Sequence, residues 1–78
     1  MVIVRFYGRL ADAIGSEIDL PAAGVSVGEV RRIVASAHCA AAAVLGRSRA
    51  LIGDHAVGDD RLVAAGDQLE FLPPVSGG

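Results

Sequence analysis

Ser26-Val-Gly-Glu-Val-Arg-Arg-Ile-Val-Ala-Ser-Ala37 is the stretch of this chain that decides its fold. It opens with a capping box, in which the Ser26 hydroxyl accepts a hydrogen bond from the Glu29 backbone N–H and the Glu29 carboxylate reaches back to the Ser26 N–H. Apolar residues then recur at helical spacing and form one stripe, with Ile33 alongside: Val27, Val30, Val34, Ala37 and Ala41. We expect the helix to run to about His38, with residues 40–43 able to extend it toward Gly46. Arg31 and Arg32 lie off the stripe, which predicts that both are on a solvated face.

Strand signals lie on both sides of this helix. Residues 2–7 are rich in β-branched and aromatic side chains. Their alternation predicts Val2, Val4 and Phe6 on a buried face and Ile3, Arg5 and Tyr7 on an outer face. A helical turn over residues 9–14 and a half-buried strand over residues 16–20 follow. After the helix, residues 50–52 and 55–57 are predicted to be short strands around a Gly53-Asp54 turn, and residues 68–72 to be the last strand.

The order of these elements defines the fold class. A strand pair, a helix and further strands make an α+β pattern. The segment between the first and last strands is long enough for these two strands to pair in parallel. We therefore predict a β-grasp fold, in which a mixed sheet wraps around one main helix, as a single domain over residues 1–78.

Composition restricts the function. The chain has 78 residues, seven arginines, no lysine, nine acidic residues and a net charge of −2. The arginines are dispersed, which is a poor footprint for nucleic acid or an anionic membrane. A thin core and the lack of a recognisable nucleophile–base pair or Gly-rich phosphate loop argue against a free-standing enzyme.

The candidate thiol and imidazole groups give weak signals. Cys39 is the only cysteine, so no internal disulfide is possible, and no basic cluster flanks it to activate the thiol. His38 and His55 do not have the ligand spacing of a zinc site, so we expect no metal. The N-terminal residues do not resemble a signal peptide, and no apolar run approaches the length of a membrane span. We expect a cytoplasmic, soluble protein.

The C-terminal residues Pro73-Pro-Val-Ser-Gly-Gly78 carry the functional signal. The prolines remove two backbone N–H groups and favour an extended chain, so residues 73–78 are expected to form a flexible tail held off the body. A tip without side chains fits a narrow channel in another protein and delivers the Gly78 carboxylate there. Val75 and Ser76 are interpreted as spacers.

The sequence Gly66-Asp-Gln-Leu-Glu-Phe-Leu-Pro-Pro-Val-Ser-Gly-Gly78 resembles the C-terminal signature of the MoaD/ThiS family of ubiquitin-like sulfur carriers. The ending is particularly similar to that of the small subunit of molybdopterin synthase. One departure is Gly53-Asp54-His55, where family members often have an Asn-Gly-like turn.

The resemblance implies that Gly78 is the reactive residue. A ubiquitin-activating-type adenylyltransferase would adenylate its carboxylate with ATP and Mg²⁺, and a sulfur donor protein would convert it to a thiocarboxylate. The sulfur would pass to the pterin precursor of the molybdenum cofactor in the large subunit of molybdopterin synthase, with which the carrier forms a heterotetramer. The carrier itself would bind no cofactor and would not be an enzyme on its own.

Two alternatives remain open from the residues. Carriers for cysteine, thiamine or other thiolated metabolites also end in Gly-Gly, and a ubiquitin-like protein modifier would use the same activated Gly78. On each reading we expect the tail and neighbouring outer-face residues to bind the partner as one contiguous surface. These residues are Ile3, Tyr7, Leu72, Pro73, Pro74, Val75, Ser76 and Gly77.

Overall fold

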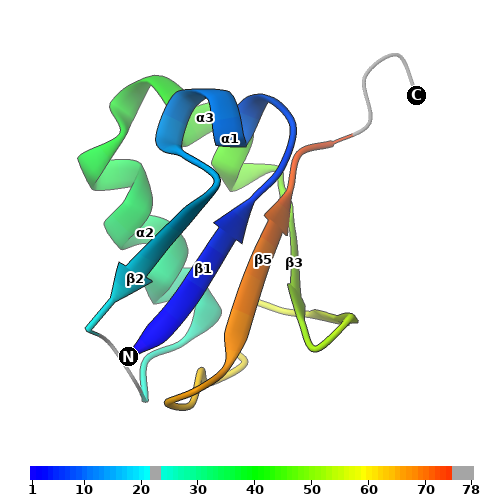
Figure 1. Cartoon of the computed structure of the whole chain (residues 1–78). Coiled ribbons are helices and arrows are strands. Elements are labelled where there is room, and N and C mark those ends of the chain that lie inside the picture. The colour runs from blue at the N-terminus through cyan, green and yellow to red at the C-terminus, as the bar shows by residue number, and fades with distance from the viewer. Residues whose placement is uncertain (22–23, 75–78) are drawn as a thin grey trace.

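A mixed sheet covered on one face by helices makes up the part of the chain that the computed structural model describes, residues 1–21 and 24–74 (Figure 1). Its elements are β1 (Val2–Phe6), α1 (Arg9–Ile14), β2 (Glu17–Leu20), α2 (Val27–Ala37), the 3-10 helix η1 (Cys39–Ala41), α3 (Ala42–Gly46), β3 (Arg49–Ile52), β4 (His55–Val57) and β5 (Gln68–Leu72). The strand order is β2-β1-β5-β3-β4. This arrangement confirms the predicted α+β class and β-grasp fold.

The pairing of β1 with β5 places the tail. These strands are parallel, with Val4 opposite Leu69 and Phe6 opposite Phe71, whereas β1–β2, β3–β4 and β3–β5 are antiparallel. Parallel neighbours end at the same edge of a sheet, so the last residues of β1 and β5 lie together (Figure 1). The predicted parallel pairing is therefore confirmed.

The core lies between the inner face of the sheet and the helices. The predicted alternation in β1 is confirmed, since Val2, Val4 and Phe6 are buried and Ile3 and Arg5 are only half-buried. The Phe6 and Phe71 rings stack with centroids 5.9 Å apart. The buried set is Val2, Val4, Phe6, Leu10, Val27, Val30, Val34, Ala41, Leu45, Ala50, Ile52, Val63, Leu69 and Phe71.

The Gly53-Asp54 turn joins β3 and β4 as predicted. Gly53 has φ +57° and Asp54 has φ +67°. Positive φ at both central positions is what a type I′ hairpin turn requires. The departure from the Asn-Gly pattern therefore does not alter the hairpin.

The start of α2 follows the sequence prediction only in part. The Glu29 N–H donates to the Ser26 hydroxyl oxygen over 3.1 Å, as the capping box requires. The Glu29 carboxylate instead forms an ion pair with Arg32, one turn further along the helix. The Ser26 side chain therefore caps the helix, but the reciprocal contact from the Glu29 carboxylate is not formed.

The helix ends close to His38, as the sequence predicts, but residues 40–43 do not extend it as one continuous helix. α2 ends at Ala37, and His38 takes a non-helical conformation with φ −133° and ψ 70°. The chain then re-forms helix as η1 and α3 in a new direction (Figure 1). This change of direction buries Ala41 and Leu45, while Ala37, expected on the apolar stripe, is exposed.

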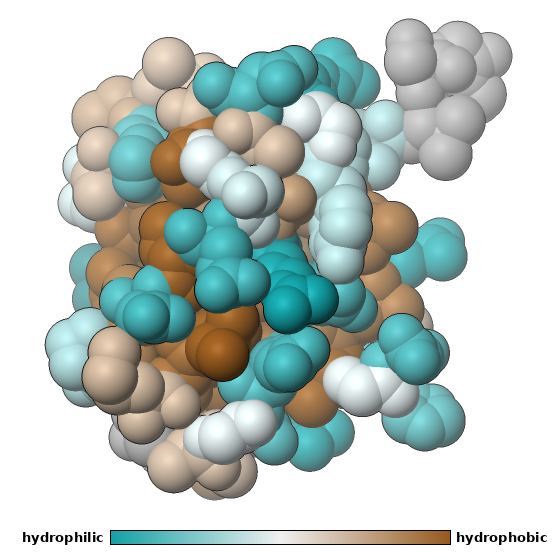
Figure 2. Space-filling view, in the orientation of Figure 1, coloured by the Kyte–Doolittle hydropathy of each residue, from teal (hydrophilic) through white to brown (hydrophobic). Residues whose placement is uncertain are grey.

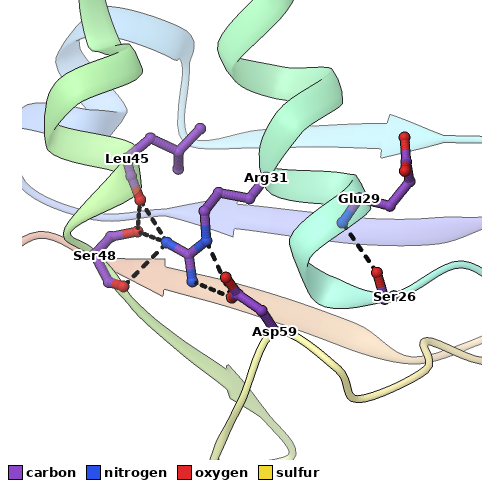
Figure 3. A network of polar contacts seen from close by, with 6 residues as sticks. All are labelled: Ser26, Glu29, Arg31, Leu45, Ser48 and Asp59. Atoms are coloured by element: carbon purple, nitrogen blue, oxygen red, sulfur yellow. Dashed lines mark hydrogen bonds and ion pairs between the residues drawn. The ribbon is translucent and has the colours of Figure 1, made fainter.

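Arg31 is not on a solvated face, which corrects a second expectation. Its side chain is only 15% exposed. The guanidinium donates to the Leu45 carbonyl and to the carbonyl and hydroxyl oxygens of Ser48, and it pairs with Asp59 over 3.0 Å (Figure 3). The guanidinium carbon also lies 5.0 Å from the centroid of the Phe71 ring. It therefore joins α2 to α3, to the loop before β5 and to the sheet. Arg32, by contrast, is exposed as predicted.

In the described ranges, every helix is too short or too polar to span a bilayer.

Candidate functional site

The base of the C-terminal tail lies where β1 and β5 end together. Tyr7 follows β1 and Leu72 ends β5, and their exposed fractions are 40% and 37%. Pro73 and Pro74 come next and are half-buried. The structure thus brings Tyr7, Leu72 and the proline pair to one edge of the sheet. Val75, Ser76, Gly77 and Gly78 lie outside the described residues.

Gly8 allows Pro73 to approach the body of the protein. Gly8 has φ +57° and ψ −135°, a conformation that side chains with a Cβ rarely adopt. A Cβ built on Gly8 would lie 3.1 Å from Pro73 Cγ. Nothing in the neighbouring sequence indicates that Gly8 contacts Pro73, a residue 65 positions away.

Two further elements lie beside the proline pair. On the α1 side, Arg9 Nη2 donates to the Pro74 carbonyl over 3.5 Å. On the β3 side, a hollow of about 350 Å³ is lined by Arg47, Arg49, Leu72, Pro73 and Pro74. The first two residues of the predicted tail, Pro73 and Pro74, therefore rest against the body rather than standing off it.

Tyr7 is held by the outer face of β5. Its hydroxyl donates to Glu70 Oε2 over 2.5 Å. This hydrogen bond, with smaller contributions from desolvation and from the Glu70 charge, raises the pKa of Tyr7 above its usual value of about 10. Tyr7 therefore presents a neutral, fixed ring beside Leu72.

Ile3 does not join this group. It lies at the other end of β1, half-buried, with Asp19 and Gln68 as its strand neighbours. The Arg5–Glu17 ion pair and Glu70 lie on the outer face between Ile3 and the tail base. Figure 2 shows the corresponding band of hydrophilic side chains across the middle of this face. Ile3 is therefore separated from the surface formed by Tyr7, Leu72, Pro73 and Pro74.

The thiol and imidazole groups lie elsewhere. Cys39 is exposed on η1, and its thiol is 3.7 Å from the Ser36 carbonyl oxygen. His38 is half-buried and His55 is exposed on β4. Over residues 1–21 and 24–74, no three His, Cys, Asp or Glu side chains are grouped to hold a metal ion. What the described site offers chemically is a docking surface and an anchored tail base.

Solved structures share the fold of this chain. SAMP1 from Haloferax volcanii is 27% identical with a TM-score of 0.76, covering 99% of this chain and 98% of that one. Subunit 1 and subunit 2 of the molybdopterin-converting factor from Helicobacter pylori 26695 were solved as a complex. A chain of this complex is 27% identical with a TM-score of 0.71, covering 99% and 97%.

A putative molybdopterin converting factor subunit 1 from Pyrococcus furiosus shares the fold at 21% identity, with a TM-score of 0.76 and coverage of 95% and 97%. The comparison with curated proteins gives no match. The model of the ThiS family matches residues 4–78, nearly the whole chain. With a β-grasp fold, a Gly-Gly terminus and this match, the chain belongs to the ThiS family, within the MoaD/ThiS group of ubiquitin-like sulfur carriers.

Proposed function

We propose that this protein carries sulfur as a thiocarboxylate at Gly78 and donates it to the pterin precursor in molybdopterin synthesis. The observation that carries the proposal is the anchored tail base: Pro73 and Pro74 rest against Gly8 and Arg9, beside the exposed Tyr7 and Leu72. A partner that docks on Tyr7 and Leu72 receives a tail that starts from a fixed point. Fixing the start of a short segment reduces the entropy lost when its tip is positioned for reaction.

The chemistry belongs to the terminal carboxylate. At pH 7 this group is ionised, since α-carboxyl groups have pKa values of about 3.3–3.7, and it is a poor electrophile. Attack of a carboxylate oxygen on the α-phosphorus of ATP releases pyrophosphate and gives an acyl adenylate. Hydrosulfide or an equivalent sulfur nucleophile then attacks the carbonyl carbon and AMP leaves. The ATP, the Mg²⁺ and the catalytic side chains are supplied by a ubiquitin-activating-type adenylyltransferase, and the sulfur comes from a donor protein.

The choice of acceptor rests on the tail and on one solved complex. The ending Pro-Pro-Val-Ser-Gly-Gly resembles that of molybdopterin synthase small subunits. The 27% identical Helicobacter pylori chain belongs to a solved complex of subunits 1 and 2 of the molybdopterin-converting factor. We therefore propose a molybdopterin synthase large subunit as the second partner, in a heterotetramer. Transfer to the pterin would occur in that subunit, so this chain would not be an enzyme by itself.

A second function is protein modification. It is favoured by the similarity to SAMP1, a small archaeal modifier protein, at 27% identity. Both functions begin with the same acyl adenylate and differ in the nucleophile, which is sulfur for a carrier and a lysine amine for a modifier. Because this chain has no lysine, conjugates would form on other proteins and not as lysine-linked chains of itself.

The proposal is tested by ATP–pyrophosphate exchange with the adenylyltransferase of the same organism. Deletion of Gly78 moves the carboxylate back by about 3.3–3.6 Å. Since misplacement of about 1 Å can cost a hundredfold in rate, exchange should fall at least that far. Gly77→Val should also fail, because a β-branched side chain crowds a channel shaped for bare backbone. Exchange by the deletion variant at the parental rate would refute the proposal.

The docking surface is tested with a pair of leucine variants. Leu72→Arg should weaken partner binding by more than about 1 kcal/mol, as expected for a residue at the centre of an interface. Leu62→Arg is the matched control for Leu72→Arg, because Leu62 is 62% exposed and does not line the hollow at the tail base. Both variants should unfold at nearly the parental temperature. Equal binding by the two variants would show that Leu72 is ordinary surface.

A further inference from the structure

Arginines from separate elements surround the tail base. Arg9 opens α1 and donates to the Pro74 carbonyl, Arg47 follows α3, and Arg49 opens β3. In the β3–β5 register Arg49 lies directly opposite Leu72. These residues are nearly half of the seven arginines in a chain whose net charge is −2. Positive charge is therefore concentrated at the place where the tail leaves the body.

The remaining arginines have partners within the fold. Arg5, Arg31 and Arg32 form ion pairs with Glu17, Asp59 and Glu29, and Arg61 donates to the Leu62 carbonyl. Within residues 1–21 and 24–74, no carboxylate forms an ion pair with Arg9, Arg47 or Arg49. Glu70, the acidic residue on the outer face of β5, accepts from the Tyr7 hydroxyl instead. The described fold thus leaves this positive charge uncompensated.

The hollow beside the prolines has the character of a carboxylate site. Arg47 and Arg49 form its polar wall, and Leu72, Pro73 and Pro74 form its apolar wall. Its volume of about 350 Å³ is near the lower end of the range for binding pockets. A Glu or Asp side chain matches both walls, because its carboxylate can accept from a guanidinium while its methylene groups contact the prolines.

We propose that Arg47 and Arg49, with Arg9 beside them, bind acidic side chains of the activating enzyme at the mouth of the channel that receives the tail. This inference rests on the function proposed above. Four residues follow Pro74, and an extended chain spans at most about 3.3–3.6 Å per residue, so the Gly78 carboxylate can lie roughly 13–14 Å from Pro74. That separation exceeds the Debye length of about 8 Å at physiological salt. The arginine group therefore acts on the protein surface at the channel mouth and not on the ATP phosphates at the reacting end.

Pairing of these arginines with acidic side chains of the activating enzyme would orient the carrier on the enzyme and raise the rate of association. Complementary charges at the rim of an interface mainly raise the association rate and select the partner, and their effect falls with salt. A carrier that must bind and leave its activating enzyme in every cycle benefits from fast association without very tight binding. The apolar contact of Tyr7 and Leu72 and the charged contact of the arginines would then form one docking surface around the tail.

The experiment compares two double variants with the same net charge. Arg47→Gln/Arg49→Gln removes two charges at the hollow, and Arg32→Gln/Arg61→Gln removes two charges from arginines that do not line it. ATP–pyrophosphate exchange is measured against carrier concentration with the adenylyltransferase of the same organism, at low and at physiological salt. Thermal unfolding of each variant verifies that it is folded.

We expect KM for the Arg47→Gln/Arg49→Gln carrier to rise about tenfold or more while kcat stays within about twofold, since the lost contacts bind ground state and transition state alike. Its KM should also depend less on salt, whereas the control should keep both the parental KM and salt dependence. Equal KM values for the two double variants, with normal exchange by the parental protein, would overturn the arginine assignment alone. Absence of exchange by the parental protein would instead overturn the proposed function on which the inference rests.

Discussion

Replacement of Arg31 by Met tests the main packing feature that sequence patterns did not predict. The Arg31 guanidinium is held by Leu45, Ser48 and Asp59 (Figure 3). It also lies over the Phe71 ring. Met keeps the length and apolar stem of the side chain but removes every donor. Arg32 is the adjacent residue, exposed and paired only within its own helix, so Arg32→Met is the matched control.

The expected loss follows from the contacts. Leu45 O keeps one partner, because the Ser48 hydroxyl donates to it over 2.6 Å. Leaving the Ser48 carbonyl without the Arg31 donor costs about 1–3 kcal/mol, and the cation–π contact with Phe71 adds about 0.5–1 kcal/mol. The pair with Asp59, whose side chain is 62% exposed, adds little. We expect a loss of about 2–4 kcal/mol for Arg31→Met, against about 0.2–0.5 kcal/mol for Arg32→Met.

Urea denaturation followed by circular dichroism measures both losses. In a domain of this size each 1 kcal/mol lowers the melting temperature by about 4–8 °C, so thermal unfolding should show the same contrast. Arg31→Lys should recover only part of the stability, because an ammonium cannot reproduce the planar fork of the guanidinium. If Arg31→Met and Arg32→Met unfold at the same urea concentration, the network does not stabilise the fold.

Three further changes test the tail base and the chemistry. Gly8→Ala should lower the free energy of unfolding by about 1–3 kcal/mol, because Gly8 has a positive φ and lies close to Pro73. Gly46→Ala is the control, since a Cβ there would meet open space, and it should change stability by less than about 1 kcal/mol. Similar losses in the two variants would contradict the close approach of Pro73 to Gly8. The single tyrosine can be titrated by its ultraviolet absorbance. Because the hydrogen bond to Glu70 raises the Tyr7 pKa, Glu70→Gln should lower the midpoint of the tyrosine titration toward about 10. Any stability that this bond gives should be present at neutral pH and should be lost only as the pH rises above about 10. An unchanged titration midpoint would contradict the contact. Cys39→Ser should leave thiocarboxylate formation intact, since the sulfur is carried on the terminal carbonyl; loss of that product in a folded variant would implicate the thiol.

Local patterns predicted most of the fold. The alternation in residues 2–6, the Ser26 cap, the Gly53-Asp54 turn and the last strand each depend on a few neighbouring residues. The parallel pairing of β1 and β5 followed from element order and from the length of the intervening segment. These features need no knowledge of how distant side chains meet.

Features that depend on distant contacts were not predicted. Arg31 is held by partners 14 to 28 residues away, and Gly8 is constrained by Pro73. The division of residues 39–46 into η1 and α3 was not predicted, because no helix-breaking residue marks the change of direction at His38. The hollow of Arg47 and Arg49 also needs β3 and β5 to be side by side. Helical periodicity alone placed Arg31 and Arg32 on the same solvated face, because it cannot distinguish adjacent positions that differ in tertiary partners.

The most direct test of the central claim is the intact mass of the parental protein. The protein is incubated with the activating enzyme of its organism, ATP, Mg²⁺ and sulfide, and a parallel sample omits ATP. The predicted result is an ATP-dependent mass increase that corresponds to exchange of one oxygen for one sulfur, located at Gly78 by fragmentation and lost when Gly78 is deleted. An unchanged mass in a sample that forms the acyl adenylate, or a product in which Gly78 is joined only to lysine amines, would contradict the sulfur-carrier function.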